Sequence, residues 1–179
     1  MTNRAAPGQY RGVSEPVRPP GSGLEAFDEI YEREFDYVWR NLGRLGVAPG
    51  DIADAVHEVF LVLYRRWNDV DRTRTMRPWL FGVARKVAAT ARRKDRETPT
   101  EIDPPNAEDP LVAQRDLVWR AMAFLDDDRR TVIILHDFEG HTGLEISEIL
   151  EIPANTVHSR LRLARVDLLA AVHKLRGAP

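Results

Sequence analysis

The chain of 179 residues contains no cysteine. This absence excludes disulfides, thiol catalysis and zinc sites built on cysteine. The sequence also lacks any apolar run close to the roughly 20 residues that a membrane-spanning helix needs, and its first residues lack the apolar core of a signal peptide. From these absences we expect a cytoplasmic protein that does not insert into a membrane.

Net charge is also small, −2 with a pI near 6.2, so the bulk composition does not indicate a nucleic-acid-binding protein. The charges are nevertheless unevenly distributed. Residues 72–96 hold nine Arg or Lys and one acid, residues 97–128 hold nine acids and two bases, and residues 157–176 hold five bases and one acid. Two basic segments separated by an acidic one predict two surfaces that face polyanions. The alternative is that each charged run is only a solvated helix face.

The alternation typical of β-strands is missing as well, and the apolar spacing is that of helices. Residues 1–22, rich in Pro and Gly, are expected to form a disordered tail. Residues 97–110, with four prolines and five acids, cannot bury a core and predict a flexible linker. Because apolar positions at helical spacing fill residues 23–96 and 111–179, we expect an all-α protein of two small helical domains joined by that acidic linker.

Turn and cap signals divide both domains into helices. Asp51 is a candidate N-cap, Pro78 opens a helix, and Asp126–Asp128 suit the positive end of another. Phe138 falls on the apolar face of the helix that follows Asp126–Asp128. The helices are expected over about 24–46, 52–67, 78–94, 111–125 and 126–140.

The segment 145–165, EISEILEIPANTVHSRLRLAR, is the most informative part of the chain. Its first half carries Ile146, Ile149 and Leu150 at helical spacing. Its second half begins a longer apolar stripe with Val157, and a proline suited to a helix start lies between the two. Polar and basic side chains occupy the opposite face. A short helix, a turn and a longer helix with an exposed basic face are typical of a DNA-reading helix-turn-helix.

Two segments at this spacing resemble a known family. They are DIADAVHEVFLVLYRRW followed by MRPWLFGVARKVAATARRK within residues 51–94, and LDDDRRTVIILHDFEGHTGLEISEILEIPANTVHSRLRLARVDLL over residues 125–169. Together they resemble the extracytoplasmic-function (group 4) sigma factors, the small two-domain initiation factors of bacterial RNA polymerase. The resemblance covers roughly residues 24–175 without the linker.

The resemblance implies a division of labour between the domains. Residues 23–96 would be sigma region 2, which docks on the β′ clamp helices of the core polymerase and captures the unwound minus-10 promoter element. Residues 111–179 would be sigma region 4, which sits on the β-flap and reads the minus-35 element as duplex DNA. Such a protein is not an enzyme and needs no cofactor, metal or small-molecule substrate. Many members of the family are held inactive by a cognate anti-sigma factor, so an anti-sigma factor is a candidate partner.

Site residues follow from the same resemblance. In the family, an acidic helical face of region 2 meets the polymerase, and here this face would consist of Asp54, His57 and Glu58. Single-stranded DNA needs cations along its backbone and an aromatic surface, and the residues expected at the minus-10 strand are Arg72, Arg74, Arg77, Trp79, Arg85, Lys86, Arg92 and Arg93. Phe81 is a further candidate for the aromatic surface, whereas the spacing of Trp79 also favours the core.

The expected minus-35 reader is the exposed start of the second helix of the helix-turn-helix. Its residues are Asn155, Thr156, His158, Ser159, Arg160, Arg162 and Arg165. Arginine to guanine is the commonest specific contact, so Arg162 is the best candidate for base reading. Arg160 and Arg165 are expected to hold phosphates, which position the protein without specifying sequence.

Four residues depart from the family pattern. His57 stands where glutamine is usual, Lys86 where asparagine is frequent, and Ser147 where alanine is usual. Glu151 occupies the turn position that glycine usually fills. If that position is left-handed, a residue other than glycine costs roughly 1–2 kcal/mol there.

Two other interpretations fit parts of the chain. His136, Asp137, His141 and Glu145 lie close in sequence, but the spacing of five between His136 and His141 does not place both on one helical face, so a metal site is not expected. A helix-turn-helix transcriptional regulator with an N-terminal helical sensing or partner domain is the second alternative. It gives no reason for the acidic face and the basic helix that precede the linker.

Overall fold

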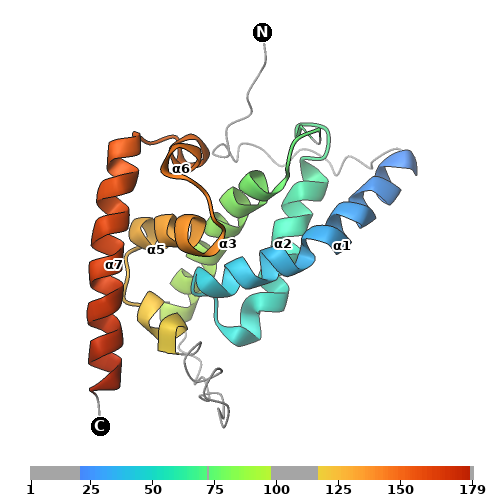
Figure 1. Cartoon of the computed structure of the whole chain (residues 1–179). Helices are drawn as coiled ribbons and strands as arrows, with labels where there is room; N and C mark the ends of the chain where they lie inside the picture. The colour runs from blue at the N-terminus through green and yellow to red at the C-terminus, as the bar shows by residue number, and fades with distance from the viewer. Residues whose placement is uncertain (1–20, 72, 98–116, 178–179) are drawn as a thin grey trace.

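The computed structural model describes residues 21–71, 73–97 and 117–177. All its regular elements are helical (Figure 1), which confirms the predicted all-α class. They are α1 (Gly21–Arg44), the short turn η1 (Pro49–Asp51), α2 (Ile52–Arg65), α3 (Arg77–Glu97), α5 (Asp127–Ile133), the π-helical turn η2 (Ile134–Phe138), α6 (Gly143–Leu150) and α7 (Ala154–Arg176), with residues 117–122 also helical. Arg72, residues 1–20 of the expected tail and residues 98–110 of the expected linker lie outside the described residues. Within the described ranges, no helix combines the length and apolar content needed to cross a membrane.

Helices α1, α2 and α3 pack into the N-terminal unit. The apolar side of α2 is buried at the positions expected from its spacing, among them Val56, Val59 and Leu63. Asp51 is the N-cap residue of α2, but its side chain makes no capping hydrogen bond. The expectation that Phe81 offers an aromatic surface is wrong, because its side chain is fully buried in the core. Trp79 is half-buried and packs against the same core.

The C-terminal unit is organised around α5 and α7. Asp126 caps α5 by accepting a hydrogen bond from the Arg129 amide at 2.8 Å, and the helix continues into η2. Val132, Ile133 and Leu135 are buried, as their spacing predicts. Phe138 is not: it is 40% exposed, and the Arg44 guanidinium lies 4.7 Å from its ring centroid. The expected buried position of Phe138 is therefore wrong, because the π-helical turn shifts the face on which it lies.

The turn between α6 and α7 is fixed by local hydrogen bonds. Thr142 and Glu145 form a reciprocal capping box at the start of α6. Glu151 ends α6 in the left-handed conformation, with φ of 56°. The Ser147 hydroxyl donates to the Ile152 carbonyl at 2.6 Å, and Pro153 then precedes the first residue of α7. The tight helix-turn-helix geometry thus includes one strained residue.

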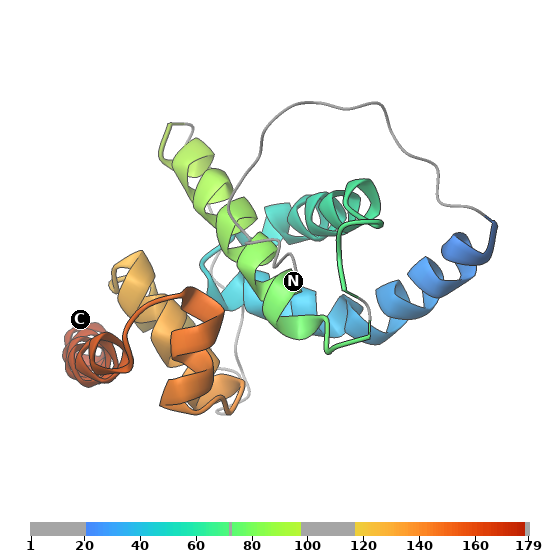
Figure 2. The ribbon, with the colours of Figure 1, turned by 90° about the horizontal axis from the view of Figure 1, so that it is seen from above.

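The two units pack against each other. Figure 1 shows α5 between α7 and α3, and the view in Figure 2 keeps the C-terminal helices against one side of the N-terminal unit. A single hydrophobic cluster includes buried residues from both units. Trp119 lies so close to Gly43 of α1 that a Cβ at Gly43 would come within 2.2 Å of its ring. The two predicted domains therefore share an interface.

The left-handed Glu151 gives a test of the turn. Replacing Glu151 with Gly should raise the free energy of unfolding by about 1 kcal/mol, because glycine adopts a positive φ without steric cost. Urea unfolding followed by helical circular dichroism measures this change.

Glu148 provides the matched control, since it is an exposed glutamate inside α6. Glu148→Gly should lower the free energy of unfolding by about 1 kcal/mol, as glycine does within a helix. Equal destabilisation by both substitutions would contradict the strain assigned to Glu151.

Candidate nucleic-acid interface

The start of α7 exposes the residues expected to read the minus-35 element. Thr156 and Arg160 are half-buried, and the others are exposed, namely Asn155, His158, Ser159, Arg162 and Arg165. Val157, Leu161 and Ala164 alternate with them along the helix and are buried in the C-terminal unit. Packing of this apolar stripe holds the polar face outward. The exposed face has the length and polarity that entry into a major groove requires.

His158 rests against the first residue of α6. A Cβ at Gly143 would lie 2.9 Å from the His158 Nε2 atom. The absence of a side chain at Gly143 therefore leaves room for the imidazole ring. Sequence reasoning selected His158 but not Gly143, because the two positions come together only through the turn.

Arg165 is already paired in this structure. Its guanidinium contacts the Asp137 carboxylate at 2.6 Å, and the His136 Nδ1 atom lies 2.6 Å from the same carboxylate. The hydrogen bond from Arg165 holds the pKa of Asp137 below its ordinary value, despite the opposing effect of burial. Asp137 therefore remains a carboxylate as pH falls toward its ordinary pKa. No group of three His, Asp or Glu side chains within the described ranges is arranged to hold a metal ion.

The arginines expected at the minus-10 strand differ in their exposure and in their partners. Arg93 is exposed, as is Arg74, which lies 3.6 Å from Asp71. Arg77 bonds the buried Glu34 at 2.9 Å, with its guanidinium over the Tyr37 ring. Burial raises the pKa of Glu34, but hydrogen bonds and charge from Arg33 and Arg77 outweigh it and leave the pKa below its ordinary value. Arg77 thus also anchors α3 to α1.

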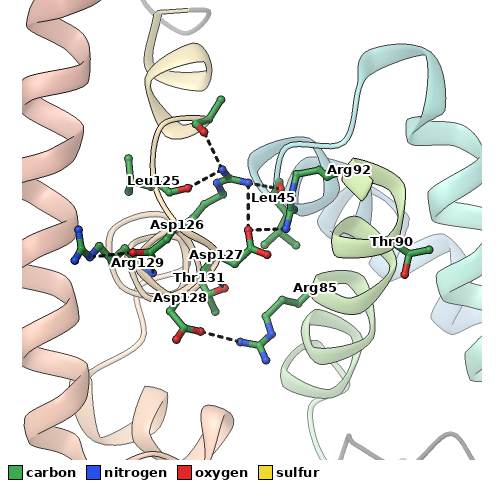
Figure 3. Close-up of polar contacts among 12 residues, drawn as sticks. Leu45, Arg85, Thr90, Arg92, Leu125, Asp126, Asp127, Asp128, Arg129 and Thr131 are labelled. Atoms are coloured by element: carbon green, nitrogen blue, oxygen red, sulfur yellow. Dashed lines mark hydrogen bonds and ion pairs between the residues drawn. The ribbon is translucent and has the colours of Figure 1, made fainter. Parts of the chain in front are cut away.

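Arg85 and Arg92, the other two arginines of α3 expected at DNA, point toward the C-terminal unit (Figure 3). Arg92 lies 2.6 Å from Asp127, and Arg85 lies 3.8 Å from Asp128. The Arg92 side chain is only 15% exposed. The sequence predicts Asp126–Asp128 as a helix start and gives no sign that two of these acids pair with the arginines.

The exposed face of α2 carries Asp54, His57 and Glu58 together. Beside it, a groove of about 310 Å³ separates α2 from α3 and is lined by Asp54, Glu58, Lys86 and Lys94 among others. Burial lowers the pKa of the Lys86 ammonium, with a smaller contribution from neighbouring Arg85 and Arg66. One groove is therefore lined on its α2 side by the acids expected to bind the polymerase and on its α3 side by the lysine expected to bind DNA.

Comparison with known families and proteins assigns both units. The family model described as "Sigma-70 region 2" matches residues 30–98, and that described as "Sigma-70, region 4" matches residues 115–168. The sigma factor NccH of Alcaligenes xylosoxydans xylosoxydans is 25% identical over 159 residues, covering 81% of this chain and 86% of the relative. The ECF sigma-E factor of Escherichia coli K12 is 28% identical over 138 residues, covering 66% and 72%.

Solved structures show the same fold. CnrH in complex with the cytosolic domain of CnrY superposes with a TM-score of 0.66 at 21% identity, covering 84% of this chain and 90% of that chain. The sigma factor RpoE in complex with the anti-sigma factor NepR from Bartonella quintana gives 0.66 at 18% identity, covering 83% and 98%. Since the two family models together span most of both helical units, the chain belongs to the sigma-70 family of RNA polymerase sigma factors, in its extracytoplasmic-function group.

Proposed function

We propose that this sigma factor selects promoters by using α2 to dock on the core polymerase, α3 to capture the minus-10 strand and α7 to read the minus-35 duplex. The observation that supports it best is that one chain presents an acidic face on α2, a basic helix α3 and an exposed polar face at the start of α7. These are the three surfaces that polymerase docking, strand capture and duplex reading require. The protein itself changes no bond.

Affinity for DNA need not be high in either domain. The polymerase would hold both domains near the promoter, so each binds at a high effective concentration. Arg162 would contact a base edge. Arg160 and Arg165 would hold phosphates once Arg160 leaves Asp128 and Arg165 leaves Asp137. Core polymerase and promoter DNA would be the partners, and the cytoplasm the place of action.

A cognate anti-sigma factor is a further proposed partner. The support is that both structural relatives were solved as complexes, CnrH with the cytosolic domain of CnrY and RpoE with the anti-sigma factor NepR. The alternative of an ordinary helix-turn-helix regulator is not favoured, because the region 2 model accounts for residues 30–98. Co-purification with core polymerase separates the two: a sigma factor forms a stoichiometric complex and directs transcription in a reconstituted assay, and a plain regulator does neither.

The first prediction concerns base reading. Arg162→Ala should weaken promoter binding by the polymerase complex on the order of tenfold, since a bidentate arginine–guanine contact is worth about 1–3 kcal/mol. Binding to core polymerase should not change. Electrophoretic mobility shift of promoter DNA measures the first quantity, and gel filtration with core polymerase measures the second.

Arg176→Ala is the matched control, because Arg176 is an exposed arginine near the other end of α7, about 21 Å along the axis at 1.5 Å per residue. It should leave promoter binding nearly unchanged. Loss of core binding by Arg162→Ala, or equal loss of promoter binding by both variants, would refute the assigned role.

The second prediction concerns docking. Replacing Asp54 and Glu58 together with Lys should abolish association with core polymerase while helical circular dichroism stays unchanged, because both side chains are exposed and reversed charges would repel a basic partner. Glu32→Lys with Asp36→Lys makes the same charge change at the same spacing on the exposed side of α1. That control should still bind. Wild-type association of the Asp54/Glu58 variant would exclude the α2 face as the docking surface.

A further inference from the structure

We propose that the acidic start of α5 is an internal competitor for DNA: in the free protein, Asp127 and Asp128 occupy arginines of both domains and hold the chain in a closed form. This inference rests on the proposed function, because it assumes that these arginines bind DNA phosphates. Asp126 is not part of the competitor, since its carboxylate caps α5.

The contacts tie cations of both domains to one short segment. Figure 3 shows the two cations from the N-terminal unit, Arg85 and Arg92. Asp127 lies 2.6 Å from Arg92 of the N-terminal unit. Asp128 lies 3.8 Å from Arg85 of the same unit and 2.5 Å from Arg160 on α7. One carboxylate thus engages an arginine expected at the minus-10 strand and another expected at the minus-35 duplex. A phosphate and a carboxylate make the same charge-assisted hydrogen bonds with a guanidinium, so DNA and Asp128 would exclude each other.

The start of α5 is also hydrogen-bonded to the residue that follows the C-terminal end of α1. The Leu45 carbonyl accepts hydrogen bonds from Arg92 of its own unit and from Arg130 of α5, the latter at 3.0 Å. Arg92 is therefore held by a carbonyl and a carboxylate at once. Separation of the two units would release Arg92 from Asp127, and its guanidinium would also have to leave the Leu45 carbonyl to reach a DNA strand.

A second contact closes the other side of the interface. Glu139 lies 2.5 Å from Arg44 of α1 and accepts a hydrogen bond from the Asn41 amide at 3.2 Å. Both partners of the ion pair are largely buried, with side-chain exposures of 18% and 10%. None of these three residues belongs to the expected DNA-binding set, so Glu139 supports the closed form independently of the competitor.

The exposure of the two acids makes their hold on the arginines reversible. Asp127 and Asp128 remain about half exposed, at 58% and 50%, and exposed ion pairs are individually weak and screened by salt. Binding of each domain to a separate surface of the polymerase would separate the arginines from the acids. The free chain would then bind DNA weakly, and the polymerase-bound chain would bind it more tightly.

Asp127→Asn with Asp128→Asn tests the competitor. The side chains keep their shape and lose their charge, so the free protein should show a larger radius of gyration by small-angle X-ray scattering. Its affinity for DNA should rise on the order of tenfold, a difference of about 1.4 kcal/mol. The probes are a fluorescein-labelled random-sequence single strand and a random-sequence duplex, read by anisotropy at low salt, because phosphate contacts do not depend on sequence.

Two further variants make the result decisive. Glu32→Gln with Asp36→Asn removes the same charge from the exposed side of α1 and should change neither the radius nor the DNA affinity beyond a small general effect. Glu139→Ala should enlarge the radius and raise DNA affinity without altering the acids of α5. If the Asp127/Asp128 variant loses helical circular dichroism, Glu139→Ala alone decides the outcome.

Three results would overturn the proposal: an unchanged radius, a gain in DNA affinity no larger than that of the Glu32/Asp36 control, or a gain in affinity without expansion. The measurements use the free chain and so do not depend on the polymerase. Failure of the wild-type protein to bind core polymerase would instead count against the proposed function.

Discussion

The arrangement of the molecule depends on the hydrogen bonds of the buried Arg130 guanidinium. Arg130 is 4% exposed and donates to the carbonyls of Met122, Ala123 and Leu125 within its own unit, and to Leu45 at the end of α1. A buried cation is stable only when its donors are satisfied. Because these acceptors come from two segments and Arg130 itself lies on α5, its position sets where residues 117–125, α5 and the end of α1 meet. The acids that follow Asp126 are then brought to the basic side of α3.

The end of α1 is shaped for this contact. Gly46 has a φ of 87°, and a Cβ there would lie 2.9 Å from the Arg130 guanidinium. Positive φ and close approach both favour glycine. The sequence shows Gly46 as a helix terminator, which is correct, but its second role depends on a residue 84 positions away, counted from 46 to 130. No local pattern reveals such a pairing.

Local signals predicted what local forces decide. Apolar spacing identified α2 and α7, and the Asp126 cap and the Pro153 start follow from the chemistry of helix ends. Failures occurred where tertiary structure decides. Phe81 is buried and Phe138 exposed because packing of α3 and the π-helical turn at Ile134–Phe138 reassign their faces. The candidate site shows the same division: exposure of Arg162 follows from helical periodicity, whereas the partners of Arg85, Arg92 and Arg160 lie far away in sequence and follow only from the packing of the two units.

The central claim is that this chain directs a polymerase to specific promoters. Sequencing the transcripts made on genomic DNA by purified core polymerase, with and without the protein, tests that claim most directly. The account predicts new transcripts that begin at discrete positions and share two upstream sequence elements at a constant spacing. Transcripts whose start sites are the same with and without the protein would contradict it.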